Sequence, residues 1–300
     1  MDMELKPEQI IDEYRLIKKL AKGGMGEVWL ATMGTDFEGT CPQKTNKVAL
    51  KFLSETNENS IKRFKDEYRF LTKLPDHPNI AKAHQFGQYN GRYYIVADYI
   101  EGENIYNATL GKSVEEKIEL FLQLLEGLDF LHRHGILHLD IKPSNVLVCH
   151  CEETKGRRGN PPVKLIDFGL ATSAKEYEKM PGGSFDYIAP EVILGHTEQV
   201  DARADLFSSA VLMYYILTSG ELPFERFAAE GDLEKLKEII SGEVLPPDPT
   251  KWSKNLSEEN IKVIMRLLEK NPDKRFYSNA RSVINSLKSK EADHFFGNIC

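Results

Sequence analysis

The chain is poor in the features that would identify a secreted or membrane protein. It has four cysteines in 300 residues, too few for a disulfide framework. Its longest apolar run, 210–217, has eight residues, whereas a membrane span needs about 20. The first residues mix Asp, Glu and Lys and contain no apolar segment of the signal-peptide kind. We therefore expect a cytoplasmic protein, with no membrane insertion by this chain.

An excess of positive charge is also missing. The chain has 46 acidic and 39 basic residues and a net charge of -7, which argues against nucleic acid or an anionic membrane as the main partner. What is present, 41% hydrophobic and 28% charged residues, is typical of an ordered globular protein. A length of 300 residues allows one large domain or two modest ones.

The hydrophobic pattern changes after the first hundred residues. In the first part, apolar runs bounded by turn residues predict strands over 14–21, 27–31, 47–53, 81–86 and 93–97. Residues 60–74 have helical spacing instead, with Phe64, Leu71 and Leu74 on the buried face. This pattern predicts a small sheet that carries one helix.

The second part is mainly helical. Apolar residues recur every three or four positions over 114–131, and Ser113 with Glu116 forms a capping box in front of them. The same spacing predicts further helices over 201–219, 232–241, 257–268 and 278–287. The fold class we expect is therefore α+β, with a small antiparallel sheet part and a larger, mainly helical part.

The first motif is a glycine-rich turn followed by a strand lysine. Residues 21–28, Ala-Lys-Gly-Gly-Met-Gly-Glu-Val, connect the first two strands, and glycines there let backbone N–H groups approach phosphates. Alone, such a turn is just as compatible with an ordinary hairpin. Lys51 ends Val-Ala-Leu-Lys on the third strand, where an ammonium group flanked by apolar residues needs an acidic partner. Glu67 and Asp66 on the helix are both candidates.

Three further motifs follow in a fixed order. They are His138-Leu139-Asp140 running on to Asn145, then Asp167-Phe168-Gly169, then Ala189-Pro190-Glu191. Asp and Asn in loops are usually only turn residues. Together and in this order, however, the motifs supply the groups that hold a magnesium nucleotide and move its terminal phosphoryl group. The chain resembles the protein kinases over about 14–289, and 23–29 with 77–80 is most similar to the eukaryotic-like Ser/Thr kinases of bacteria.

The resemblance implies a bilobal kinase fold and a reaction. It implies an N-terminal extension over 1–13, a kinase domain over 14–289 that divides into 14–98 and 99–289, and a tail or linker over 290–300. The cofactors implied are ATP and Mg²⁺, and the partner implied is a protein substrate phosphorylated on Ser or Thr. No oligomeric state follows from the resemblance.

Matching motif residues receive the roles of the family. Asp140 would accept the proton of the attacking hydroxyl, Lys142 would lie by the transferred phosphate, and Lys51 would contact the α- and β-phosphates. The family pattern and Leu71 favour Glu67 over Asp66 as the partner of Lys51. The metal ligands implied are Asn145 and Asp167. Nucleotide binding is implied for Leu20, Ala21, Gly23, Gly24, Gly26, Val28, Ala49, Lys51, Ala97, Asp98, Ile100 and Leu147.

Three pairings are expected to support these groups. Phe168 would pack inside with His138 and Leu71, and Asp205 would support the catalytic loop from below. Glu191 would be paired with Arg275, because a single buried carboxylate is costly.

Several positions depart from the family pattern. Leu139 stands where most members have the Arg that meets a phosphate on the activation loop, so we expect activity without phosphate at Thr172, Ser173 or Tyr177. The alternative is that Leu139 marks a weakened enzyme. Ala97 is a small residue at the gatekeeper position and predicts an open pocket behind the adenine.

Other readings of the motifs stay open. A pseudokinase or nucleotide-binding scaffold would use the same fold without turnover. A small-molecule phosphotransferase is disfavoured by the Ala189-Pro190-Glu191 segment, which resembles a protein-substrate platform. Asn104 and Ser144 stand where Arg-directed kinases often carry acids, so no strong requirement for a substrate Arg is expected. Cys149-His150-Cys151 offers too few ligands for zinc and reads as part of a surface insertion.

Overall fold

The computed structural model describes nine stretches of the chain and divides into two compact units. The first unit comprises Met1–Asp76 and Ala81–Glu101, and the second comprises His77–Ile80 and Gly102–Cys300. The residues described are 4–23, 26–33, 47–55, 57–150, 161–173, 185–224, 246–251, 256–275 and 277–288. The helix expected over 232–241 therefore lies outside the described residues.

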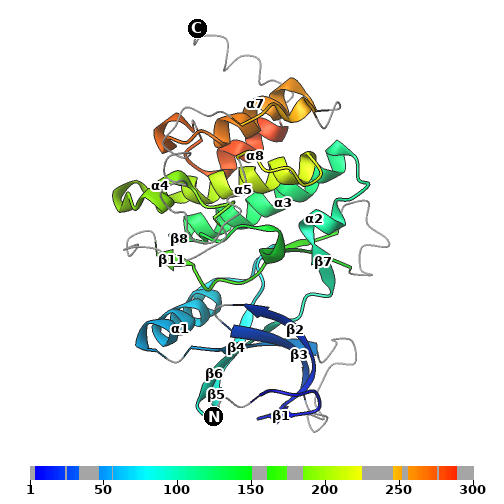
Figure 1. The fold of residues 1–300 in the computed structure, drawn as a ribbon, viewed down its shortest axis with the longest axis vertical. Helices are drawn as coiled ribbons and strands as arrows, with labels where there is room; N and C mark the ends of the chain where they lie inside the picture. Colours follow the sequence, from blue (N-terminus) through cyan, green and yellow to red (C-terminus); the bar gives the residue numbers. More distant parts are fainter. Residues whose placement is uncertain are drawn as a thin grey trace. The chain divides into compact units, whose positions relative to one another are not determined.

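The first unit is an antiparallel sheet of six strands with one helix (Figure 1). The order of the strands across the sheet is β1-β2-β3-β4-β6-β5. All five predicted strands and the predicted helix are present, and only the two-residue strand β1 was not expected. The elements are β1 (Ile10–Ile11), β2 (Tyr14–Gly23), β3 (Gly26–Met33), β4 (Lys47–Leu53), α1 (Glu58–Lys73), β5 (Ala83–Tyr89) and β6 (Arg92–Asp98).

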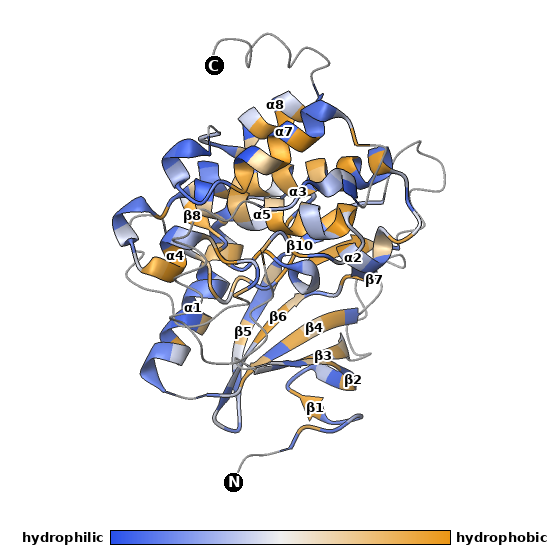
Figure 2. Ribbon diagram, turned by 45° about the horizontal axis from the view of Figure 1, so that its top comes forward, coloured by the Kyte–Doolittle hydropathy of each residue, from blue (hydrophilic) through white to orange (hydrophobic). Residues whose placement is uncertain are grey.

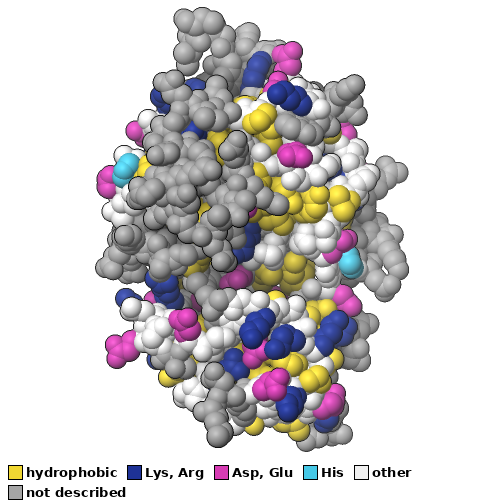
Figure 3. All heavy atoms as spheres, viewed as in Figure 1, with side chains coloured by type: hydrophobic (Ala, Val, Ile, Leu, Met, Phe, Trp, Pro, Cys, Tyr) yellow, Lys and Arg dark blue, Asp and Glu magenta, His cyan; other side chains and the backbone are white. Residues whose placement is uncertain are grey.

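The sheet register sets the position of the lysine motif. Lys51 on β4 lies opposite Val28 on β3 and Ile95 on β6, so it stands on a central strand with neighbours on both sides. One core cluster of this unit is formed by Leu5, Ile11, Tyr14, Leu16, Trp29, Ala31, Leu50, Phe52, Tyr94 and Val96. On the face of the unit visible in Figure 3, basic and acidic side chains lie close together.

Helix α1 presents one apolar face to the sheet. Asn57 caps its N-terminus by accepting a 2.9 Å hydrogen bond from the backbone N–H of Ser60. Phe64, Glu67 and Leu71 are the buried residues of the helix, at the spacing of one helical face. A carboxylate on an otherwise apolar face requires a cationic partner, and Lys51 on β4 supplies it.

The second unit is mainly helical, with two small antiparallel sheets (Figure 1). Its sheets have the strand orders β10-β9-β7 and β11-β8. The helices are α2 (Ile105–Ala108), α3 (Val114–Arg133), α4 (Pro190–Leu194), α5 (Ala202–Leu217), α7 (Glu258–Leu267) and α8 (Ala280–Lys288). The strands are β7 (Gly102–Asn104), β8 (Ile136–Leu137), β9 (Val146–Cys149), β10 (Val163–Leu165) and β11 (Thr172–Ser173). Short 3₁₀ turns are η1 (Pro143–Asn145), η3 (Thr197–Gln199), η4 (Pro249–Lys251) and η5 (Pro272–Lys274).

Helices α3 and α5 form the centre of this unit. The capping box of α3 is confirmed, because Ser113 and Glu116 each accept a hydrogen bond from the other's backbone N–H. Hydrophobic colour runs along both helices in Figure 2, and α5 is buried over almost its whole length. None of the helices in the described part of the chain is long and apolar enough to cross a lipid bilayer.

Candidate active site

The lysine motif forms a buried ion pair within the first unit. Lys51 Nζ lies 2.7 and 2.8 Å from the two carboxylate oxygens of Glu67, whose side chain is 4% exposed. Asp66, the rival candidate, instead contacts Arg69 at 3.0 Å on the exposed side of α1. The expected choice of Glu67 is confirmed, because the helix register directs only that carboxylate toward β4.

The glycine-rich hairpin is held in a close backbone contact. Gly23 pairs with Gly26 at the end of β2 and β3. A Cβ atom at Gly26 would lie 1.9 Å from the carbonyl oxygen of Phe52, so only glycine fits there. Leu20, Ala21 and Gly23 are exposed at the same hairpin, Val28 is half-buried, and Gly24 lies outside the described residues.

A buried carboxylate at the base of this hairpin was missed by the sequence reasoning. Glu27 contacts Lys19 Nζ at 2.6 Å and Arg92 Nη1 at 3.0 Å. Burial acts to raise the pKa of Glu27, but the hydrogen bonds from the two cations outweigh it and the pKa is lowered. Arg92 also donates from Nε to the carbonyl oxygen of Leu53 at 3.4 Å. The cluster therefore joins β2, β3, β4 and β6. Only the position of Glu27 beside the last glycine of the motif could have pointed to it.

The residues expected to contact adenine lie in two places. Ala49 and Ala97 face each other on β4 and β6. The N–H of Asp98 donates to the carbonyl of Lys82 at 2.9 Å. Ile100 follows β6 and is half-buried, whereas Leu147 belongs to β9 of the second unit.

In the second unit the catalytic-loop carboxylate is fixed through one oxygen. Asp140 Oδ2 lies 2.7 Å from Lys142 Nζ and 2.8 Å from Asn145 Nδ2. Asn145 Nδ2 also lies 2.8 Å from the backbone carbonyl oxygen of Asp140. The other carboxylate oxygen, Oδ1, has no hydrogen-bond donor among the residues that the structure describes. The loop thus orients an acceptor oxygen and keeps a cation beside it.

The expected support of this loop by Asp205 is confirmed. The carboxylate of Asp205, at the start of α5, accepts hydrogen bonds from the backbone N–H groups of His138 and Leu139 at 2.9 and 2.8 Å. It also contacts His132 Nε2 at 2.8 Å. Burial acts to raise the pKa of Asp205, but these contacts, His132 foremost, outweigh it and lower the pKa.

The loop needs this support because of its backbone. Leu139 has a φ of 59°, a left-handed conformation that costs a non-glycine residue about 1–2 kcal/mol. Its side chain is 5% exposed. The two N–H groups bound to Asp205 belong to Leu139 itself and to the residue before it, and these hydrogen bonds hold the strained position in place.

Asn145 and Asp167, the expected metal ligands, are carried by neighbouring backbones. The N–H of Ile166 donates to the carbonyl oxygen of Asn145 at 3.0 Å, and Val146 pairs with Leu165 in the β9–β10 ladder. Asp167 itself is exposed and has a φ of 61°. Asn145 and Asp167 therefore lie just beyond the same end of the β9–β10 strand pair.

Phe168 holds this segment from inside. Its side chain is 1% exposed, and its ring centroid lies 4.8 Å from that of His138, which is fully buried. The expected packing of these two rings is confirmed. It fixes the chain on both sides of the Asp167 carboxylate.

The donor set fits magnesium. A carboxylate and an amide supply oxygen atoms, and Mg²⁺ is commonly bound by one or two protein oxygens, with phosphates and water completing the shell. In the described part of the chain, no cluster of three or more His, Cys, Asp or Glu side chains could hold a metal ion. One carboxylate and one amide suit an ion whose remaining ligands are phosphates and water.

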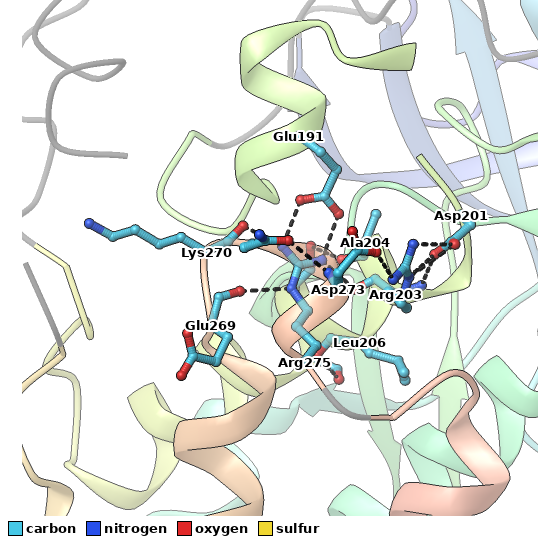
Figure 4. Close-up of polar contacts among 12 residues, drawn as sticks. Glu191, Asp201, Arg203, Ala204, Leu206, Glu269, Lys270, Asp273 and Arg275 are labelled. Atoms are coloured by element: carbon cyan, nitrogen blue, oxygen red, sulfur yellow. Dashed lines mark hydrogen bonds and ion pairs between the residues drawn. The ribbon is translucent and has the colours of Figure 1, made fainter. Parts of the chain in front are cut away.

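The expected Glu191–Arg275 pair is also confirmed (Figure 4). Both guanidinium nitrogens of Arg275 lie 2.6 Å from the Glu191 carboxylate, and the two side chains are 0% and 1% exposed. Arg275 further donates to the carbonyl oxygens of Arg203, Glu269 and Lys270. This network ties α4 to α5 and to the turn η5.

Comparisons with known proteins agree with this geometry. A family model described as protein kinase domain matches residues 14–286. The chain is 32% identical over 287 residues to serine/threonine-protein kinase pkn2 of Myxococcus xanthus, which covers 90% of this chain and 32% of that protein. It is 30% identical to tyrosine-protein kinase MasK of Myxococcus xanthus strain DK1622, over 95% of this chain and 44% of that protein. The chain thus spans less than half the length of either relative.

A solved structure shows the same fold. The kinase domain of Mycobacterium tuberculosis PknI matches with a TM-score of 0.69 and 24% identity, over 95% of this chain and 98% of that one. The sheet with one helix and the mainly helical unit both belong to that fold. The chain is a member of the protein kinase family.

Proposed function

We propose that this chain transfers the γ-phosphoryl group of ATP, with Mg²⁺, to a Ser or Thr hydroxyl of a protein substrate. The observation that carries the proposal is the arrangement around Asp140. Its carboxylate is held through Oδ2 by Lys142 and Asn145, and the strand that leads to Asp167 is bonded to the same turn. A base, a cation and two metal-ligand oxygens thus belong to one braced loop system.

Each of these groups has a role in the reaction. Asp140 Oδ1 accepts the proton of the attacking hydroxyl and orients its oxygen toward the γ-phosphorus. Lys142 stabilises charge on the transferred group. Asn145 and Asp167 would hold Mg²⁺, which would supply neutralisation of the charge on the phosphate oxygens.

The first unit supplies the nucleotide contacts of the proposal. Lys51, oriented by Glu67, binds the α- and β-phosphates, and the glycine-rich hairpin covers them. The nucleotide-binding residues that we propose are Leu20, Ala21, Gly23, Gly24, Gly26, Val28, Ala49, Ala97, Asp98, Ile100 and Leu147.

Phosphorylation of Ser or Thr is favoured over Tyr by the catalytic loop. Asp140-Ile-Lys142-Pro143 carries the lysine pattern that is typical of Ser/Thr kinases. The relatives do not decide the matter, since one is named for serine/threonine and another for tyrosine. The acceptor therefore has to be measured.

The test is phosphoryl transfer by the purified chain. We expect label from radioactive ATP, in the presence of Mg²⁺, to appear on Ser or Thr of a basic test protein. Asp140→Asn and Asp167→Ala should each lower the rate by about a hundredfold or more, because the base and the metal ligand are lost. Asp66→Asn is the matched control, because Asp66 pairs with the exposed Arg69 on the outer side of α1, and it should keep the rate.

Two outcomes would contradict the proposal. Label that persists in Asp140→Asn would exclude the proposed base. ATP binding without any transfer would instead favour a nucleotide-binding scaffold. Label on tyrosine alone would keep the kinase activity and correct its acceptor.

A further inference from the structure

Three tyrosines from distant parts of the second unit gather in one place. The ring centroids of Tyr106 on α2 and Tyr215 on α5 lie 4.7 Å apart, and those of Tyr187 and Tyr215 lie 6.3 Å apart with an edge-to-face angle of 75°. We call these three residues the tyrosine cluster. The geometry is that of favourable aromatic pairs, so the rings stabilise one another.

The cluster is left open on a helix that is otherwise buried. From Ala204 to Leu217, Tyr215 is the one residue of α5 that is not buried. Tyr106 and Tyr187 are also only half-buried, and Phe185, two residues before Tyr187, is 46% exposed. Four aromatic residues thus leave apolar surface in contact with water, where a ligand could cover it.

Tyr106 of the cluster is anchored to the turn after α5. The hydroxyl of Tyr106 donates to the carbonyl oxygen of Ser219 at 3.1 Å, in the turn that follows α5. In that turn Gly220 has a φ of 111°, and a Cβ atom there would lie 3.0 Å from the Tyr106 hydroxyl. The turn is therefore shaped around this hydroxyl. A surface fixed in this way loses little freedom when it binds a ligand.

The cluster lies beside the catalytic loop. Helix α2, with Tyr106 as its second residue, packs against the turn η1, which contains Asn145 and follows Lys142. Tyr187 precedes Pro190, the first residue of α4, by three positions. An extended peptide advances about 3.3 Å per residue. Substrate residues close in sequence to a Ser or Thr bound at Asp140 can therefore reach the tyrosine cluster.

We propose that the tyrosine cluster binds an apolar or aromatic side chain of the protein substrate, close in sequence to the phosphorylated residue. The inference rests on the proposed kinase function and names its substrate class. Tyrosine faces offer apolar contact area, and burial of a large apolar side chain is worth more than the cation–π contact of an exposed Arg. Asn104, the cap of α2, is neutral, although Asp186 directly precedes Tyr187 and Glu221 follows the turn that Tyr106 contacts.

The experiment compares peptides that differ only at one position beside the acceptor Ser. Each flanking position carries Leu, Phe, Ala or Arg in turn, and kcat/KM is measured with purified chain and MgATP. At one position we expect Leu or Phe to exceed Ala by about tenfold. In Tyr215→Ala that ratio should fall to about one, whereas Tyr215→Phe should keep it, because the ring remains.

Using a ratio separates peptide recognition from folding. Two peptides assayed with one enzyme preparation share any loss of folded enzyme, so only recognition of the varied side chain alters the ratio. Tyr106→Ala provides a second variant with the same expected effect. The control is Phe130→Ala, which removes an aromatic stacked on His77 at 4.4 Å elsewhere in the same unit and should leave the ratio unchanged.

The possible outcomes distinguish this inference from the function on which it rests. Transfer to all peptides with no preference for Leu or Phe would overturn this inference but not the proposed kinase function. A preference for Arg that Tyr215→Ala removes would have the same meaning. A ratio that Tyr215→Ala and Tyr106→Ala both leave unchanged would do the same. Transfer to none of the peptides or proteins would overturn the proposed function and this inference with it.

Discussion

Under the proposed function, we expect Leu139 to limit what the catalytic loop responds to. Its side chain is 5% exposed and apolar, so it offers no charge to a phosphate on the chain that follows. Thr172 and Ser173 are two of the nearby candidate positions for phosphorylation. They form β11, which pairs with Leu137 and Ile136 just before Leu139. Tyr177 lies outside the described residues.

We therefore expect activity without phosphate at these three positions. A variant with Thr172→Ala, Ser173→Ala and Tyr177→Phe should keep kcat/KM within about threefold of the parent, because no group in the loop depends on the added charge. The measurement uses protein treated with phosphatase, whose phosphate content is checked by mass. Loss of activity in a variant that still melts cooperatively would contradict this.

Glu27 is expected to position the glycine-rich hairpin. Glu27→Gln keeps the size of the side chain but leaves Lys19 and Arg92 without their shared anion. We expect the KM for ATP to rise severalfold with a smaller change in kcat, and stability to fall by about 1–2 kcal/mol. Kinetics and thermal unfolding of the purified variant measure both effects.

The matched control for Glu27 is an exposed ion pair in the same unit. Glu8 and Arg15 also form an ion pair, at 3.2 Å, but their side chains are 72% and 55% exposed. Such a pair contributes about 0–1 kcal/mol, so Glu8→Gln should leave the KM for ATP and the stability nearly unchanged. If Glu27→Gln and Glu8→Gln had equal effects, the expectation that Glu27 positions the glycine-rich hairpin would be wrong.

Among the elements, those with strong local signals could be predicted from the sequence. The capping box at Ser113 fixed the start of α3, and the spacing of Phe64 and Leu71 fixed the face of α1 and with it the choice of Glu67. Glu191 and Arg275 could be paired because a buried carboxylate needs a cation. In each case a chemical requirement and a sequence position point to the same answer.

The remaining features depend on contacts that form only in the folded chain. Strand β1 has two residues and α2 has four, too few for a periodic pattern. Glu27 meets a cation 65 positions away, and the tyrosine cluster joins residues from three separate segments. No local pattern in the sequence marks these partners.

Strand β1 and the residues before it are part of the sheet of the first unit. Leu5 and Ile11 are 4% and 0% exposed within its core cluster, and the N–H of Glu8 donates to the carbonyl of Leu16 at 2.8 Å. Leu5→Ala should lower stability by about 2–3 kcal/mol through the lost burial and the cavity left behind. Ile10→Ala is the control, because Ile10 is 55% exposed, and should change it by less than about 0.5 kcal/mol. Chemical denaturation of the two variants measures the difference; similar losses would mean that this segment is not packed as described.

At the scale of the whole molecule, the chain enters the second unit twice. The segment His77–Ile80 lies between two parts of the first unit in sequence but belongs to the second. Asn79 Nδ2 donates to the carbonyl of Val163 at 2.8 Å, and the N–H of Leu165 donates to the carbonyl of Asn79 at 2.8 Å. His77 stacks on Phe130 at the start of this segment. The segment is thus fastened to the β10 strand that leads to Asp167.

This attachment should weaken in acid. Burial lowers the pKa of His77, and the charge of Lys164 lowers it further, while Glu126 and Asp129 act in the opposite direction. The folded state therefore binds fewer protons at His77 than the unfolded state, so the stabilisation is complete above the unfolded pKa near 6.5 and is lost as pH falls below it. Hydrogen exchange of the Leu165 amide, corrected for its intrinsic rate, should show less protection at pH 5.5 than at pH 7.5. In His77→Phe, which keeps a ring against Phe130 but cannot take up a proton, that pH dependence should be smaller. Protection that rises toward pH 5.5 in the parent, or an equal fall in both proteins, would show that protonation of His77 does not control this attachment.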